Sequence, residues 1–519
     1  MVNVTSFFFI LPLLMNQLFI ETEKIQDPRE GKLQVISNID TCVKISEILE
    51  PTLGPYGMDK LFTGENFLIT NDGATILKKL NIVHPVGDFF VKMSESQDNE
   101  IGDGTTSVVI QAAAILNMLK PLIKEGLPLD EIYEELHKIK NLCLKELEHY
   151  KIEFSDDLLL SLAETSINSK NIRNVKKQFS KMILSAVQNV NGDLKMIGIN
   201  KIPGGSISDS VLVNGIAFEK CFTYAGYEQQ PKKILNPKIC CINVELEWKA
   251  ERENAEMKIE SINEYKKVVN TEWNLIKEKL DSIIESGANV VLSSLPIGDY
   301  ATQYFAKNNI FCAGRVSKDD LLRVTSAFGG VIVSSTNYLN NCLGTCAVFE
   351  ERQIGKERFN YFEGKNANAC TLILRGPGIE VLNEVERSVN DALNVIKVAI
   401  KHKEVVTGGG SVEMRLSKFL KEISVKYKDK KYFICKAISQ SFEKIPFVLA
   451  NNFGLDTTLT IPLLRKSFKN EKYTSGLGIR GVTDMQKQAV FEPLQTKINI
   501  IKTAFDVAAT IITIDSTIV

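Results

Sequence analysis

The residues best suited to chemistry are gathered in the stretch 102–107, which reads Gly-Asp-Gly-Thr-Thr-Ser. Apolar residues follow it at helical spacing, so the stretch is predicted to be a loop that feeds a helix N-terminus. Such a terminus offers unpaired backbone N–H groups and the positive end of the helix dipole, which suit a phosphate. Two glycines let the backbone approach a ligand closely, and three hydroxyls add donors.

Asp103 is the unusual member of this stretch, because a bare carboxylate repels phosphate unless a cation lies between them. The pattern therefore favours a phosphate–Mg²⁺ site in which Asp103 holds the metal. On these six residues alone, a Gly/Asp turn followed by an ordinary Thr or Ser N-cap fits about as well.

Three further loops offer groups to such a site. Gly54 and Gly57 lie in a Pro/Gly loop whose backbone could contact phosphate, although this spacing is usually only a turn. The run 71–73, Asn-Asp-Gly, is typical of a tight turn with a solvated Asp72; its alternative role is a carboxylate aimed at the metal or at an attacking water. The glycine run 408–410 indicates a close backbone approach or a flexible hinge.

Two charged residues farther along are ambiguous. Lys170 ends a polar junction, 165–170, between two predicted helices; most junctions of this kind are caps, but a lysine there could reach a terminal phosphate. Asp391 lies off the apolar stripe of a helix predicted over 380–401. A lone aspartate on such a helix face is usually solvated.

The elements that must position these residues divide the chain into thirds. Helical periodicity dominates both ends, whereas strands and helices alternate between about 192 and 334, which predicts an α/β unit with a small sheet. A unit inserted into a discontinuous helical domain explains this order. The segment 245–267, dense in Glu and Lys, indicates an exposed helix or projection. The β-branched run 511–514 suggests a C-terminal strand.

Composition narrows the class of protein. Lys and Arg total 62 against 63 Asp and Glu, so no global field favours nucleic acid or an anionic membrane. Four histidines, and ten cysteines without a C-x-x-C pair, argue against a zinc site or a Ser-His triad. Scattered cysteines fit a reducing compartment, so we expect a cytosolic protein.

The apolar run 7–15 resembles the core of a signal peptide. No basic residue precedes it and no cleavage site follows, and it is too short to span a bilayer. A packed N-terminal strand is the favoured interpretation, with a wrongly assigned gene start as the alternative.

Together these motifs resemble the ATP-binding signatures of the group II chaperonins, the TCP-1/CCT family. The matching stretches occur in order across nearly the whole chain: 53–60 (LGPYGMDK), 71–77 (NDGATIL), 97–107 (QDNEIGDGTTS) and 408–410 (GGG). Three further stretches resemble one particular paralogue within the family: 195–199, 224–233 and 296–305.

The resemblance implies a multidomain α + α/β fold. It implies a mainly helical equatorial ATPase domain (1–148 and 405–519), an intermediate hinge domain (149–217 and 370–404) and an apical substrate-binding domain (218–369) with a helical protrusion near 245–285. The implied function is ATP-dependent folding of unfolded client proteins, in which ATP hydrolysis with Mg²⁺ drives closure of a double-ring chamber. The implied partners are paralogous subunits, eight per ring, with neither nucleic acid nor membrane.

The resemblance also implies roles for single residues. Asp103 would bind Mg²⁺, Asp72 and Asp391 would position and deprotonate the attacking water, and Lys170 would sense the terminal phosphate. The implied nucleotide-binding residues are Gly54, Pro55, Gly104, Thr105, Thr106, Ser107, Asn168, Ser169, Gly408, Gly409, Glu492 and Lys497. Arg480 stands where the family usually carries an aspartate, which puts the local nucleotide contacts in question.

Two other functions compete with this interpretation. One is a ring subunit that is mainly structural and hydrolyses little ATP, for which Arg480 is the sequence support. The other is a kinase-type phosphotransferase acting on a small molecule. A kinase needs a compact acceptor pocket, whereas the charged segment 245–267 and the α/β insert suit large clients better.

Overall fold

The structure is a computed structural model. It describes residues 32–516 except for 64–66, 171, 220–225, 248–261, 337–338, 340, 365–366 and 470–472. The chain forms two compact units: unit 1 joins residues 1–180 to 387–519, and unit 2 holds residues 181–386. The predicted N-terminal strand and most of the charged segment 245–267 fall outside the described residues.

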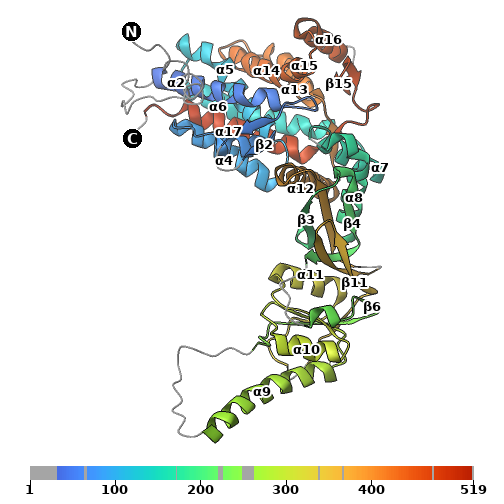
Figure 1. Ribbon diagram of the computed structural model, residues 1–519. Coiled ribbons are helices and arrows are strands. Elements are labelled where there is room, and N and C mark those ends of the chain that lie inside the picture. The colour runs from blue at the N-terminus through green and yellow to red at the C-terminus, as the bar shows by residue number, and fades with distance from the viewer. Residues whose placement is uncertain are drawn as a thin grey trace, which may run out of the picture. The chain divides into compact units, whose positions relative to one another are not determined.

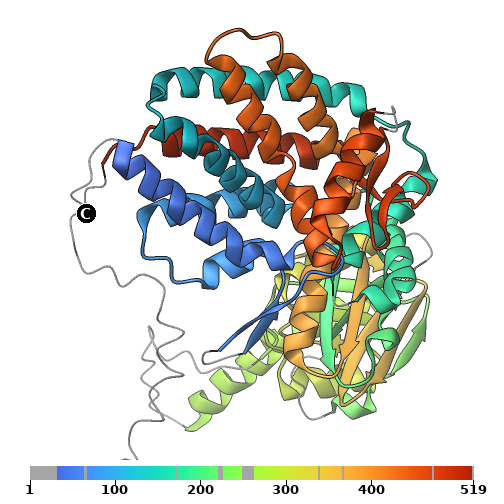
Figure 2. The ribbon, with the colours of Figure 1, turned by 90° about the horizontal axis from the view of Figure 1, so that it is seen from above.

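Unit 1 is a helical bundle built from both ends of the chain (Figures 1 and 2). The helix α5 packs against α2, α14 and α17, and their buried faces form one apolar core that includes Ile39, Leu116 and Phe505. The main helices of the bundle are α2 (Lys32–Leu49), α4 (Pro85–Glu100), α5 (Thr105–Lys124), α6 (Leu129–Leu147), α13 (Ser411–Ser424), α14 (Lys431–Ser441) and α17 (Leu494–Ile512).

The helix α5 is the one helix within the described ranges that is long and apolar enough to cross a membrane. Its apolar residues are already covered by the protein, because Val108, Ile115 and Leu119 are fully buried in the core of unit 1. The core position therefore explains the composition of α5, and the prediction of a helix that follows the loop 102–107 is confirmed.

Shorter elements of unit 1 hold its loops in place. Three antiparallel pairs join β1 (Lys60–Phe62) to β2 (Leu68–Thr70), β14 (Val405–Thr407) to β17 (Phe491–Pro493), and β15 (Ser475–Gly478) to β16 (Gly481–Asp484). The pair β14–β17 brings the glycine run 408–410 next to Glu492, although the 81 residues 411–491 separate them along the chain. The remaining helices are α3 (Gly73–Lys79), α7 (Asp156–Asn168), α15 (Lys444–Asn452) and α16 (Thr457–Lys469), and α12 (Ile379–His402) enters the unit from residue 387.

Unit 2 confirms the predicted alternation of strands and helices. One sheet has the order β10-β7-β8-β9, with β7, β8 and β9 parallel, and α9 (Ile262–Glu285), α10 (Asp299–Lys307) and α11 (Lys318–Phe328) accompany it. A second, antiparallel sheet has the order β5-β12-β11-β6, and a third has the order β3-β13-β4. The strands are β3 (Ile197–Pro203), β4 (Val211–Val213), β5 (Gly215–Glu219), β6 (Lys233–Leu235), β7 (Lys238–Ile242), β8 (Val290–Ser293), β9 (Phe311–Ala313), β10 (Gly344–Thr345), β11 (Val348–Ile354), β12 (Glu357–Glu363) and β13 (Cys370–Gly376).

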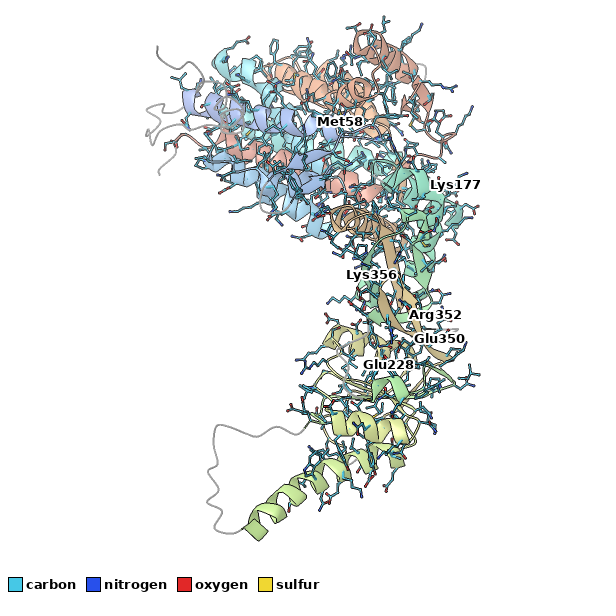
Figure 3. All side chains as sticks on the ribbon, in the orientation of Figure 1. Met58, Lys177, Glu228, Glu350, Arg352 and Lys356 are labelled. Carbon is cyan, nitrogen blue, oxygen red and sulfur yellow. The ribbon has the colours of Figure 1, made fainter. Side chains whose placement is uncertain are left out.

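Opposite faces of the antiparallel sheet differ in chemistry. Phe349 of β11 is fully buried, and its ring centroid lies 4.3 Å from that of Phe311 and 5.0 Å from that of Phe362. On the opposite face of β11 are Glu350 and Arg352, labelled in Figure 3, whose charged groups lie 2.9 Å apart. Their cross-strand neighbours on β12, Tyr361 and Phe359, are buried in a cluster with Ile373 of β13. Apolar packing on both faces therefore holds this sheet to its neighbours, since exposed ion pairs add little stability.

Two predictions about elements are wrong. The run 511–514 does not form a strand, because α17 continues to Ile512; Ile511 and Ile512 are fully buried in the bundle core, and this packing outweighs their β propensity. The polar junction 165–170 is shorter than predicted, because α7 continues to Asn168.

Candidate functional site

A cavity of about 410 Å³ in unit 1 is walled by several of the loops that the sequence singled out. The site residues predicted from the sequence that line it are Gly54, Pro55, Asp103, Gly104, Ser107, Asn168, Ser169, Gly409, Glu492 and Lys497. The others, Asp72, Thr105, Thr106, Lys170, Asp391 and Gly408, are not among the residues that wall it.

The stretch 102–107 forms the predicted loop and helix start. Gly104 is the N-cap of α5 in the left-handed conformation, with φ at +81°, and no side chain caps the helix. The backbone N–H of Gly104 donates to Oδ1 of Asp103 at 2.7 Å, and Nε2 of Gln97 donates to the carbonyl oxygen of Asp103 at 2.8 Å. Because Gly104 and Ser107 both line the cavity, the N-terminus of α5 opens on it and offers free N–H groups there.

Asp72 is a buried helix cap rather than a solvated turn residue. It is 7% exposed, and its Oδ2 accepts hydrogen bonds from the backbone N–H of Thr75 at 3.0 Å and from the Thr75 hydroxyl at 2.7 Å. Its Oδ1 accepts from the hydroxyl of Thr105 at 3.0 Å, which ties Asp72 to the first turn of α5. Burial acts to raise the pKa of Asp72, but the charge of Lys170 and these hydrogen bonds outweigh it, so the pKa is lowered and the group is ionised.

Lys170 and Asp391 form a buried ion pair. Nζ of Lys170 lies 2.8 Å from Oδ2 of Asp391, and their side chains are only 9% and 11% exposed. The expectation that Asp391 is solvated is therefore wrong. Burial raises the pKa of Asp391 to about 7, and the carboxylates of Asp72 and Asp103 add to this rise although Lys170 opposes it. Burial acts to lower the pKa of Lys170, but the charges of Asp391, Asp72 and Asp103 outweigh this effect, so the pKa of Lys170 is raised. The three aspartates are thus grouped around one lysine.

A second buried cation closes another part of the cavity wall. Nζ of Lys497 lies 2.8 Å from Oε1 of Glu413 and 2.6 Å from Oε2 of Glu492. Burial raises the pKa of Glu492, with Glu413 adding to the rise and Lys497 opposing it. Sequence reasoning missed Glu413, which lies in the first turn of α13 just after the glycine run. Its position directly after the glycine run is the sequence feature that could have identified it as a site residue.

The glycine run 408–410 allows close packing. A Cβ atom on Gly408 would lie 2.7 Å from Oε1 of Glu492, and one on Gly409 would lie 2.5 Å from Sδ of Met485. Gly409 also has φ at +65°. Of the two interpretations left open by the sequence, the structure favours the close backbone approach.

Two further residues of the cavity wall escaped the sequence analysis. The hydroxyls of Ser166 and Thr496 are buried and have no hydrogen-bond partner within the described part of the chain, and both residues line the cavity. Buried polar atoms rarely go unpaired, so these hydroxyls suit a polar ligand. Arg480 is exposed in the turn between β15 and β16, whereas its neighbours Gly478 and Ile479 line the cavity.

The donor set fits Mg²⁺ that arrives with a phosphate. Among the described residues no group of three or more His, Cys, Asp or Glu side chains could hold a metal ion on its own. Mg²⁺ is commonly held by one or two carboxylates together with phosphate oxygens and water. Asp103, on the cavity wall beside the N-terminus of α5, provides such a carboxylate.

Comparisons with known proteins cover nearly the whole chain. Residues 45–519 match the TCP-1/cpn60 chaperonin family. The chain is 60% identical over 505 residues to T-complex protein 1 subunit eta of Encephalitozoon cuniculi, covering 97% of this chain and 99% of that protein. It is 45% identical over 507 residues to the subunit of the same name from Saccharomyces cerevisiae and 44% identical over 508 residues to that from Homo sapiens, covering 95% of this chain and 92% and 93% of those proteins.

Proposed function

Because the chain belongs to the TCP-1/cpn60 chaperonin family, as its motifs predicted, and is similar to eta subunits over nearly its whole length, we propose that it is an ATP-hydrolysing subunit of a hetero-oligomeric protein-folding chaperonin. The observation that carries the proposal is the arrangement in unit 1: a cavity of about 410 Å³ at the N-terminus of α5, with the buried group Asp72, Lys170 and Asp391 linked to the same helix start through Thr105.

The proposed partners and cellular localisation follow from the family. The other subunits are paralogous chains in a double ring, eight per ring, and the clients are unfolded proteins in the cytoplasm. In this proposal unit 1 contains the equatorial domain, the ranges 149–217 and 370–404 form the intermediate domain, and the range 218–369 forms the apical domain.

Binding of ATP would use the cavity wall. The N–H groups of the 104–107 loop would contact phosphates, since N–H groups at a helix start favour anions. Gly54 and Pro55, which also line the cavity, would lie beside these phosphates. Asn168 and Ser169 would lie near the nucleotide, Gly408 and Gly409 against the ribose, and Glu492 and Lys497 near the sugar and base. Asp103 would hold Mg²⁺, which neutralises charge on the phosphates when it is bound.

The buried group would act on the attacking water. Asp72 is ionised and fixed by three hydrogen bonds, so it can orient a water molecule. Asp391 has a pKa near neutrality, which suits a general base. Lys170 holds Asp391 in place and can compensate the charge of a terminal phosphate. Because Asp391 lies on α12, we propose that movement of this helix brings it to the nucleotide and couples hydrolysis to chamber closure.

The substitution Asp391→Ala tests the catalytic part of the proposal. ATP binding is expected to stay close to wild type while steady-state hydrolysis falls by a factor of about 100 or more, because general-base contributions are of this size. Nucleotide titration and phosphate release measure the two quantities in assembled particles that carry the variant in this subunit alone. Asp319→Ala, which removes an exposed acid in unit 2, is the control. Equal loss of binding and hydrolysis would remove Asp391 from the reaction.

The mass of the native particle separates the alternatives. A chaperonin subunit elutes with its paralogues at megadalton mass, whereas a small-molecule kinase elutes far below it. A mainly structural ring subunit would give the same mass but no change in hydrolysis with Asp391→Ala. Arg480, the sequence support for that alternative, is exposed and is not among the residues lining the cavity.

A further inference from the structure

Unit 1 contains a second cavity, of about 460 Å³, that the proposed ATPase does not use. It lies between α13 and α16, next to the start of α15, three helices that pack on one another (Figure 1). Its volume lies in the range of small-molecule pockets. None of its lining residues lines the nucleotide cavity. They are Met414, Ser417, Lys418, Lys421, Glu443, Pro462, Arg465, Lys466, Phe468 and Lys469.

The residues that line this cavity carry an excess of positive charge. Five of its ten lining residues are cationic and one is acidic, although the whole chain has 62 basic against 63 acidic residues. Apolar groups, among them Met414 and Phe468, make up the rest of the wall with Ser417 and Pro462. A local excess of cations in a nearly neutral chain marks a place that attracts anions.

The single carboxylate is already paired. Glu443 has a side chain only 10% exposed, and its two oxygens accept hydrogen bonds from the guanidinium of Arg465. The hydroxyl of Ser417 donates to the same carboxylate at 3.2 Å, and Nζ of Lys421 lies 3.8 Å from it. Glu443 therefore holds Arg465 and Lys421 at the cavity and has no further charge to offer the remaining lysines.

Two of the three remaining lysines have no anionic partner within the described ranges. Nζ of Lys418 donates to the carbonyl oxygen of Phe468 at 3.2 Å and lies 3.7 Å from Glu422 outside the cavity wall. Lys466 and Lys469 have no ion-pair partner in the described ranges. Lys418 and Lys421 are one helical turn apart on α13, as are Lys466 and Lys469 on α16. Like charges at this spacing repel each other unless an anion lies between them.

We propose that this basic cavity binds a small polyanion that carries several phosphate groups. Lysine donates charge-assisted hydrogen bonds to phosphate oxygens, and within the described ranges no carboxylate competes for Lys466 and Lys469. Several phosphates fit better than one, because the cations come from two facing helices and surround a cavity wide enough for a drug-sized molecule. The site is separate from the nucleotide cavity, so the proposal does not depend on the ATPase.

Calorimetric titration of the full chain with inositol hexakisphosphate or linear tripolyphosphate tests the site, with Mg²⁺ and saturating ADP present to occupy the nucleotide cavity. We expect binding that weakens with salt and is at least about tenfold weaker in the double variant Lys466→Gln, Lys469→Gln, since each lost charged hydrogen bond accounts for about this factor. The two probes distinguish an inositol ligand from a chain polyphosphate.

Two matched variants make the result specific to the cavity. Lys466→Arg with Lys469→Arg keeps the charge and should keep the binding. Lys124→Gln with Lys145→Gln removes the same charge from exposed positions elsewhere in unit 1 and should leave binding unchanged. Unfolding curves without ligand check that each variant is folded. Absence of binding by both probes, or equal weakening in the Lys124/Lys145 variant, overturns the proposal.

Discussion

The carboxylate of Asp391 is subject to two opposing effects. Burial and the neighbouring carboxylates of Asp72 and Asp103 favour its protonated form, while Lys170 at 2.8 Å favours the ionised form. The balance raises the pKa of Asp391 from the ordinary aspartate value of 3.8 to about 7. A group with this pKa changes its charge in the physiological range, and its state depends directly on Lys170.

This balance predicts how hydrolysis depends on pH. A general base works only when it is ionised, so kcat/KM for ATP is expected to fall as the pH drops through about 7. Lys170→Gln removes the cation that lowers the pKa of Asp391, so the pKa rises further and the fall should begin at a higher pH. Rate profiles of the wild type and the variant measure this displacement. A profile that moves to lower pH, or not at all, would contradict the assigned role of Lys170.

At the residue scale, the sequence predicted what is local. The loop 102–107 and the helix start after it follow from glycine spacing and apolar periodicity over adjacent residues. The burial of Asp72 and Asp391 could not be predicted in this way, because it depends on Thr105, 33 residues from Asp72, and on Lys170, 221 residues from Asp391. Glu413 was missed for the same reason: its partner Lys497 lies 84 residues away.

At the scale of elements, α12 rests on the loop that precedes α5. Gly102 has φ at +76°, and a Cβ atom on it would lie 2.3 Å from Nδ2 and 2.6 Å from Cβ of Asn394. Asn394 is one helical turn beyond Asp391 on α12, so the two side chains share a face. The absence of a side chain at Gly102 therefore sets how closely Asp391 approaches the stretch 102–107.

Gly102→Ala is expected to push α12 from this loop. Hydrolysis should fall at least about tenfold, because an ångström-scale displacement of a catalytic group has effects of this order or larger. Phosphate release measures the loss. Gly126→Ala is the matched control, since Gly126 also has a left-handed φ, +97°, but a Cβ atom there meets nothing within 4 Å.

The control separates backbone strain from collision. Gly126→Ala should cost about 1 kcal/mol in unfolding free energy from the left-handed conformation, with hydrolysis near wild type. Adding Asn394→Gly to Gly102→Ala removes the colliding Cβ together with the amide and should recover part of the activity. If both glycine variants lose hydrolysis equally, strain rather than the contact with α12 is responsible.

Apolar periodicity predicted where helices form better than it predicted which elements pack against one another. The apolar spacing over 108–118 and 380–401 predicted α5 and α12, because one face of a helix is formed by residues three and four apart in the sequence. The pairing of β14 with β17 has no local signal, since each strand has three residues and the paired residues lie 84 to 88 positions apart. The end of α17 was missed because burial of Ile511 and Ile512 depends on the rest of the bundle.

At the scale of the whole molecule, the two ends of the chain share one core. Ile39 of α2, Leu116 of α5 and Phe505 of α17 belong to the same apolar cluster, so the N-terminal third cannot complete its packing without the C-terminal helix. Unit 2 has separate clusters, one of which contains Phe311 and Phe349. The order of helical and α/β segments along the chain indicated such an insertion. The finer division into equatorial, intermediate and apical domains remains a prediction.

Separate cores predict separate responses to core substitutions. Phe505 is 1% exposed beside Phe442, and Phe311 is fully buried beside Phe349, so each phenylalanine supports one unit. Phe505→Ala should lower the unfolding free energy of unit 1 by about 3–5 kcal/mol and leave unit 2 unchanged, and Phe311→Ala should do the reverse. Hydrogen exchange resolved along the chain measures both units in one experiment.

Nucleotide provides an independent check on the same two units. ADP with Mg²⁺ should slow exchange in unit 1 alone, because a ligand stabilises the unit that binds it. Unit 1 should therefore respond to both Phe505→Ala and nucleotide, and unit 2 to Phe311→Ala only. A single transition that both substitutions lower equally would mean that the chain unfolds as one body. In that case Phe505→Ala could no longer be used to weaken the nucleotide cavity without also weakening the α/β insert.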